Sequence, residues 1–312
     1  MHLPGLSAGR PVARPSPRRY QNPSMKPQSR HIAALPTLVT LGNAFCGFLA
    51  ATYLLEAASQ AGLVRSALSA GLEDSPHRDL FFAYLVKAVW SMFAAMVFDF
   101  LDGKVARLTR SESAFGVQID SLSDVVSFGL VPALMFKTLG EFEFGLRPKT
   151  ALVLGCFHLF GAILRLARFN VEAEPDTDDH RCFKGLPTPA AAAGVAVLVY
   201  LYASAASGDD TTELVAPALV QQWVAAAFPF IIVGLGVLMW TRLPYVHAAN
   251  LLLTERRQPS HLLAILATIG VVAWEPPIAM AVLMLGYAMS GPVLYVWDLF
   301  TGHATVEGES WL

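Results

Sequence analysis

The sequence is poor in charge. Only 15% of its 312 residues are Asp, Glu, Lys or Arg, whereas a soluble domain averages about a quarter. Its three cysteines follow no metal-ligand spacing, and no internal repeat or low-complexity tract stands out. The apolar runs do not alternate apolar and polar residues, which argues against a membrane β-barrel. These absences exclude an ordinary soluble domain and a disulfide framework.

Long apolar runs are what the chain has instead. Its residues are 54% hydrophobic, and a membrane-spanning helix needs about 20 consecutive apolar residues. The fold class is therefore predicted to be all-α, a polytopic integral membrane protein with about eight transmembrane helices. The candidate spans lie near residues 35–55, 80–98, 120–140, 150–169, 187–205, 223–241, 261–275 and 277–297.

The distribution of Lys and Arg predicts the orientation. Residues 1–34 hold six Lys/Arg, no acid and several prolines, a composition typical of a disordered basic arm. If this arm is cytoplasmic, sixteen Lys/Arg lie in cytoplasmic segments and four in outside loops, in agreement with the positive-inside rule. We therefore predict a cytoplasmic arm, a transmembrane domain over 35–300 and a short tail over 301–312.

Four aspartates lie where helices should enter the membrane, in the stretch DFLDGKVARLTRSESAFGVQIDSLSD. Asp99 and Asp102 are three residues apart, and Asp120 and Asp124 are four apart, so each pair projects from one face of a helix. A short polar turn joins the two segments, and an antiparallel helical hairpin would bring the pairs together. Carboxylates at membrane depth are costly and indicate function.

Such a cluster favours a metal site. Four carboxylates in one place cannot all stay ionised without a cation. Their hard oxygens suit Mg²⁺ or Mn²⁺, and Mg²⁺ usually binds together with substrate phosphates. Arg107 is a candidate phosphate ligand, and Gly103 and Ala106 leave room for a bulky group. Solvation or a salt bridge explains any one aspartate alone, but not the spacing of all four.

The fixed positions follow the pattern Asp99-x2-Asp102-Gly103-x2-Ala106-Arg107-x8-Gly116-x3-Asp120-x3-Asp124. This pattern resembles the complete signature of the CDP-alcohol phosphotransferases. The resemblance implies a six-helix core and an intramembrane enzyme that displaces CMP from a CDP-linked lipid with an alcohol hydroxyl, using two divalent metal ions.

The same resemblance implies a role for each matching residue. Asp99 and Asp120 would bridge both ions, and Asp102 would bind one of them. Asp124 would bind the other ion and act as the general base. The residues implied to contact the CDP moiety are Gly103, Arg107 and Ser113.

Four further blocks resemble the bacterial phosphatidylserine synthases within that family: LPTLVTLGNAFCGFLA (35–50), DSLSDVVSFGLVPAL (120–134), RLARFN (165–170) and FKGLPTPAAAA (183–193). In the first block these proteins use a Pro-Asn-x-x-Thr pattern that helps to hold the nucleotide. Here Thr37 replaces the Asn, while Thr40 keeps the Thr.

The resemblance implies CDP-diacylglycerol and L-serine as substrates, with release of CMP. A family member that uses glycerol phosphate, inositol or choline remains an alternative, since only the RLARFN and GLPTPAAA blocks favour serine. A cation transporter with aspartates along an ion path is an alternative of another class, but its usual repeated halves are not evident in the sequence.

Two basic residues, Arg165 and Arg168, end the fourth span, and Lys184 follows it. Arg165, Arg168 and Lys184 either recognise a phosphate or the serine carboxylate, or anchor the helix ends at the interface. His158, within the span, is expected to hydrogen-bond to a neighbouring helix. The implied partners are the two substrates and membrane lipid, with no nucleic acid and with a homodimer as the family expectation. The implied location is the bacterial inner membrane, with the active site facing the cytoplasm.

Overall fold

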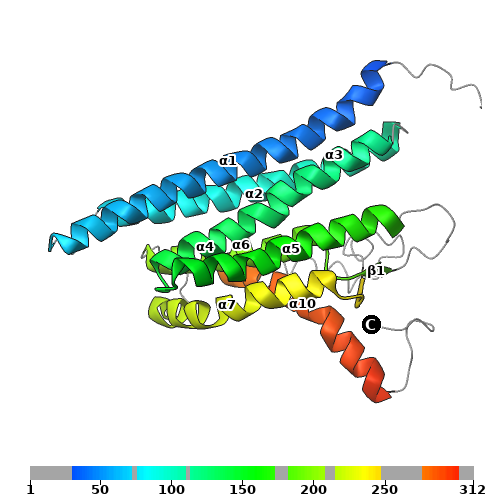
Figure 1. The fold of residues 1–312 in the computed structure, drawn as a ribbon. Helices are drawn as coiled ribbons and strands as arrows, with labels where there is room; N and C mark the ends of the chain where they lie inside the picture. The colour runs from blue at the N-terminus through cyan, green and yellow to red at the C-terminus, as the bar shows by residue number, and fades with distance from the viewer. Residues whose placement is uncertain are drawn as a thin grey trace, which may run out of the picture.

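The computed structural model describes residues 30–71, 76–109, 113–172, 182–207, 215–246 and 276–301. Two three-residue strands, β1 (Cys182–Lys184) and β2 (Pro244–Val246), pair antiparallel. The other elements are helical, as predicted (Figure 1): α1 (Arg30–Ser69), α2 (Pro76–Thr109), α3 (Ala114–Asp124), the π-helical turn η1 (Val125–Leu130), α4 (Val131–Phe142), α5 (Pro148–Glu172), α6 (Thr188–Ala206), α7 (Pro217–Trp240) and α10 (Pro276–Thr301).

Seven helices within the described residues are long and apolar enough to cross a membrane. They correspond to seven of the eight predicted spans, with α3, η1 and α4 forming one continuous span over Phe115–Phe142. The chain is therefore an integral membrane protein. The eighth predicted span, 261–275, lies outside the described residues, as do residues 1–29 of the predicted arm and residues 302–312 of the tail.

Two helices are much longer than their predicted spans. α1 continues to Ser69 and α2 to Thr109, and both run as long rods along one side of the molecule (Figure 1). The end of α1, AASQAGLVRSALS, is too polar for a span but rich in Ala and Leu, which favour helix in any solvent. Hydropathy thus located the apolar part of each helix but not its end.

The centre of the bundle is α6. It contacts α2, α4, α7 and α10, and 78% of its apolar window is buried. Its sequence TPAAAAGVAVLVYLYASAA is dominated by small residues, which let neighbouring helix backbones approach closely within a membrane.

Close contact also fixes α5 against α7. A Cβ at Gly161 would overlap the backbone of Gly236, and a Cβ at Gly236 would overlap the carbonyl of Phe157. The two helices lie side by side (Figure 1). Any larger residue at either glycine would push them apart.

The β1–β2 ribbon connects the loop before α6 with the loop after α7. Phe183 pairs with Tyr245, and the Gly185 N–H donates to the Leu243 carbonyl at 2.8 Å. Gly185 has a φ of +87° and a Cβ there would lie 2.6 Å from the Thr241 carbonyl oxygen. Only glycine meets both requirements without strain.

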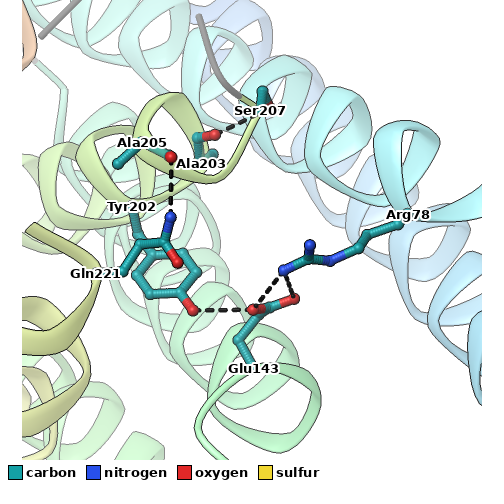
Figure 2. A network of polar contacts seen from close by, with 7 residues as sticks. All are labelled: Arg78, Glu143, Tyr202, Ala203, Ala205, Ser207 and Gln221. Atoms are coloured by element: carbon teal, nitrogen blue, oxygen red, sulfur yellow. Dashed lines mark hydrogen bonds and ion pairs between the residues drawn. The ribbon is translucent and has the colours of Figure 1, made fainter. Parts of the chain in front are cut away.

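A polar network links helices at the end of the bundle that is remote from the aspartates. Arg78 of α2 forms an ion pair with Glu143 at 3.2 Å, and the Tyr202 hydroxyl of α6 donates to the same carboxylate at 2.8 Å (Figure 2). Since a helix rises about 1.5 Å per residue, Arg78 lies roughly 30 Å along α2 from Asp99. That distance is about the thickness of the hydrocarbon core, so the network and the aspartates belong to opposite membrane faces.

Candidate active site

Three of the four predicted aspartates converge. Asp99 of α2 and Asp120 and Asp124 of α3 each place a carboxylate oxygen within 4.8 Å of the others. Asp124 is buried, and the other two are partly buried. The helical hairpin predicted from the spacing therefore brings the two segments together at their aspartates.

Asp102 extends this group. It is 5% exposed and faces both Thr40 of α1 and Asp120 of α3. Asp102 Oδ2 and Asp120 Oδ1 are buried and have no hydrogen-bond partner among the described residues. Buried acceptors without partners are rare in native structures, and a bound ion is one recognised explanation.

This arrangement fits a divalent metal ion. The donor atoms are all hard carboxylate oxygens, the kind that Mg²⁺ and Mn²⁺ prefer. Carboxylates as close as those of Asp99, Asp120 and Asp124 repel one another strongly in a site of low dielectric, and a cation removes that repulsion. The free oxygens of Asp102 and Asp120 are available to bind it.

Asn43 contacts the cluster, although no sequence motif had marked it. Its side-chain amide donates to Asp124 Oδ1 at 3.0 Å, and its backbone carbonyl accepts from Ser127 Oγ at 3.1 Å. Asn43 is fully buried, and a Cβ at Gly47, one turn on, would overlap Ser127. A polar stripe at helical spacing in an apolar helix (Thr40, Asn43) was the signal that could have found it.

Arg165 lies beside the aspartates. Its side chain is 8% exposed and interacts electrostatically with Asp124 and Asp99. Nη1 donates to Thr188 Oγ1 at 3.0 Å, while Nε has no hydrogen-bond partner within the described part of the chain. The guanidinium therefore has a donor left for another group at the site.

Arg168, one turn further along α5, makes different contacts. Its Nη1 donates to the Trp240 carbonyl at 2.9 Å, and its Nη2 donates to the Thr241 carbonyl at 3.2 Å. These carbonyls end α7, where a cation is favourable. In the same block, Asn170 donates to Ser121 Oγ at 2.9 Å, next to Asp120 of α3.

The structure describes the residues predicted to contact the nucleotide or another anionic group to different extents. A Cβ at Gly103 would meet no atom within 4 Å, so the space that a bulky group would need is open. Ser113 caps α3 by accepting from the Gly116 N–H at 3.0 Å, and Thr40 is buried and donates to the Pro36 carbonyl. Thr37 is partly buried on α1. The backbones of Arg107 in α2 and Lys184 in β1 are described, but their side chains are not.

His158 was predicted to bond to a neighbouring helix, and this is confirmed. Its Nε2 lies 3.0 Å from the carbonyl of Phe128 in η1. The side chain is fully buried.

Fold and site together define a polytopic helical membrane protein with an acidic, metal-compatible centre. The CDP-alcohol phosphatidyltransferase family matches residues 33–233. The chain belongs to this metal-dependent family, and its Asp99, Asp120 and Asp124 could hold a metal ion.

Similar proteins are known from several lineages. The chain is 45% identical over 116 residues to a CDP-diacylglycerol–serine O-phosphatidyltransferase of Helicobacter pylori, which covers 37% of this chain and 47% of that protein. Proteins of the same name from Saccharomyces cerevisiae and Mycobacterium bovis are 32% and 28% identical, over 52% and 70% of this chain and 52% and 68% of theirs. The chain thus spans about half the length of the first of these relatives.

Proposed function

We propose that this protein is a phosphatidylserine synthase that transfers the phosphatidyl group of CDP-diacylglycerol to L-serine and releases CMP. The main support for this proposal is that Asp99, Asp120 and Asp124, which occupy positions of the family signature, converge in the structure. The names of the relatives support serine as the acceptor. So does the bond from Arg165 to Thr188, because it joins the RLARFN and GLPTPAAAA blocks beside the aspartates.

In the proposed reaction the serine hydroxyl oxygen forms a bond to the phosphorus that carries diacylglycerol. The bond from that phosphorus to the CMP oxygen breaks, and CMP leaves with the electron pair. Asp124 accepts the hydroxyl proton as general base and later returns it to solvent. Asn43 holds Asp124 in place through its 3.0 Å hydrogen bond.

The aspartates would hold two divalent ions, Mg²⁺ or Mn²⁺. Asp99 and Asp120 would be shared between them, with Asp102 and Asp124 each binding one. When bound, such ions neutralise the pyrophosphate and stabilise the charge of the transition state and of the leaving CMP. Thr37, Thr40, Gly103, Arg107 and Ser113 would surround the nucleotide.

The test is an assay of the purified protein with CDP-diacylglycerol and Mg²⁺ against serine, glycerol phosphate, inositol and choline. We expect CMP to appear only with serine, together with phosphatidylserine. CMP release with another alcohol would retain the family chemistry but reject the acceptor. No release with any alcohol would reject the proposal.

We further propose that the site faces the cytoplasm of a bacterial inner membrane, on the basis of the Lys/Arg distribution. In a variant without native cysteines, a Cys at Ser111 should be protected from a membrane-impermeant reagent added outside intact cells. A Cys at Ser207 should react. The opposite labelling pattern would reverse the orientation. A homodimer stays a prediction of the family resemblance, which the mass of the purified protein tests.

Arg165 is the basic residue that we propose to recognise the serine carboxylate or a phosphate. Arg165→Lys keeps the charge but loses the planar fork and the free Nε–H. Since a hydrogen bond to a charged group contributes about 1.5–3 kcal/mol, the KM for serine or for CDP-diacylglycerol should rise at least roughly tenfold.

Arg168→Lys is the matched comparison, because the lost bonds there go to the end of α7. We expect this variant mainly to lower the melting temperature. Arg168 and Lys184 are also proposed as contacts for the serine carboxylate or a phosphate, below Arg165 in rank. Unchanged kinetics of Arg165→Lys would favour interfacial anchoring instead.

A further inference from the structure

A π-helical turn comes directly after the aspartates. η1 begins at Val125, the residue after Asp124, and its last bond runs from the Val131 N–H to the Val126 carbonyl, five residues back. π-turns are rare and often occur at functional sites. Their presence here needs a local cause.

We attribute the turn to Pro132, which lies directly after it in the first turn of α4. In an α-helix the N–H of residue 132 would bond to the carbonyl of Phe128, but proline has no N–H and its ring crowds that carbonyl. The Phe128 carbonyl therefore lacks the donor that a regular α-helix would give it. Phe128 is fully buried, so bulk water does not replace that donor.

His158 of α5 supplies the missing donor. Its Nε2 lies 3.0 Å from the Phe128 oxygen, and since a carbonyl only accepts, Nε2 must carry the hydrogen. The histidine itself has little freedom. It is fully buried, and its own backbone packs against Gly236 of α7.

The other side of the turn is attached to α1. Ser127 Oγ of η1 donates to the Asn43 carbonyl at 3.1 Å, and the Asn43 side chain donates to Asp124. The turn is thus held between α1 and α5, one residue away from Asp124. A π-turn holds one residue more than an α-helical turn. Removing one residue from a helix rotates the segment before it by about 100° relative to the segment after it. Closing this turn into regular α-helix would therefore move Asp120 and Asp124 away from Asp99.

We propose that η1 sets the register of Asp120 and Asp124 and that His158 is its positioning residue, acting through the Phe128 carbonyl. This inference deepens the proposed function and rests on it for its kinetic readout. It assigns no contact between His158 and substrate. The hydrogen bond from His158, and not the bulk of its imidazole, keeps Asp120 and Asp124 in position.

The experiment compares His158→Gln with His158→Leu in the full-length purified protein. Gln presents an N–H donor at about the position of Nε2, whereas Leu fills the space without a donor. The matched control is Tyr245→Phe. Tyr245 donates its hydroxyl to the Ala288 carbonyl at 2.9 Å, which Pro292 of α10 leaves without a donor in the same way. Burial raises the pKa of Tyr245 above its ordinary value, so the hydroxyl remains a donor.

We expect His158→Leu to lower kcat by roughly 10²-fold, the effect of a misplacement of about 1 Å at a reacting group. The KM for CDP-diacylglycerol should rise as well, because the displaced Asp120 is one of the proposed shared ligands of the ions that hold the pyrophosphate. Amide hydrogen exchange should become faster in residues 125–132. His158→Gln should keep most of the activity and the slow exchange. Tyr245→Phe should keep kcat even though it loses a bond of the same kind.

Two results would overturn the inference. One is wild-type kcat and exchange in His158→Leu. The other is an equal loss in His158→Gln and His158→Leu, which would show that the imidazole's shape matters and not its donor. If the proposed function were wrong, the unaltered protein would release no CMP with serine. That outcome is distinct from the two above, because the exchange measurement needs no turnover.

Discussion

Asp120→Asn is expected to abolish CMP release at ordinary metal concentrations. Asparagine keeps the shape of the side chain but removes the charge at a carboxylate whose Oδ1 is buried without a partner among the described residues. Charge stabilisation by bound metal contributes several kcal/mol, and each 1.4 kcal/mol is about tenfold in rate. We therefore expect a loss on the order of 10³-fold or more, partly recovered by excess Mg²⁺ or Mn²⁺.

The measurement is the rate of CMP release as a function of metal concentration for the single variants of Asp99, Asp102 and Asp120. Asp79→Asn is the matched control, since it removes an acid from α2 at the opposite end, where Asp79 is exposed. It should behave as the unaltered protein does. Near-normal turnover of a folded Asp120→Asn protein without added metal would exclude Asp120 as a ligand.

Much of this site could be predicted from the sequence because helical geometry is local. Spacings of three and four residues place each aspartate pair on one face, and a short polar turn forces the two helices into a hairpin. The convergence of Asp99 with Asp120 and Asp124 follows from these two facts. Neither requires knowledge of the other spans.

The contacts between distant helices could not be predicted in this way. Asn43 reaches Asp124 across 81 residues of sequence, and which face of α1 packs on α3 depends on the whole bundle. Pro132 indicates that the Phe128 carbonyl loses its donor, but only the position of α5 shows that His158 replaces it. Helix ends could not be predicted either, because hydropathy reports burial in lipid and not the propensity that carries α1 to Ser69.

The two sequence blocks that favour serine, RLARFN and GLPTPAAAA, contact each other in the fold. Arg165 of RLARFN bonds to Thr188 of GLPTPAAAA, and Asn170 of RLARFN bonds to Ser121 beside Asp120. The RLARFN block thus contacts both the start of α6 and α3, the helix that carries Asp120 and Asp124. In the proposed synthase, this connection would let residues outside the signature affect which alcohol reaches the aspartates.

The last prediction separates Asp124 from the other aspartates. A general base is needed only when the nucleophile attacks, whereas shared metal ligands are needed even to hold the pyrophosphate. Asp124→Asn keeps Oδ1, the atom that accepts from Asn43, so the side chain should stay in place. It should bind CDP-diacylglycerol nearly normally while turnover falls by on the order of 10²–10⁴, the usual contribution of acid–base catalysis.

Asp99→Asn should instead lose binding and turnover together, because a charge shared by both ions disappears. Direct binding of CDP-diacylglycerol at saturating Mg²⁺, measured on both variants beside their rates of CMP release, distinguishes the two roles. If Asp124→Asn loses binding as severely as Asp99→Asn, Asp124 acts chiefly as a ligand. The proton of the serine hydroxyl must then pass to another acceptor, and the side chain to test would be Asp102, whose Oδ2 is buried with no partner in the described residues.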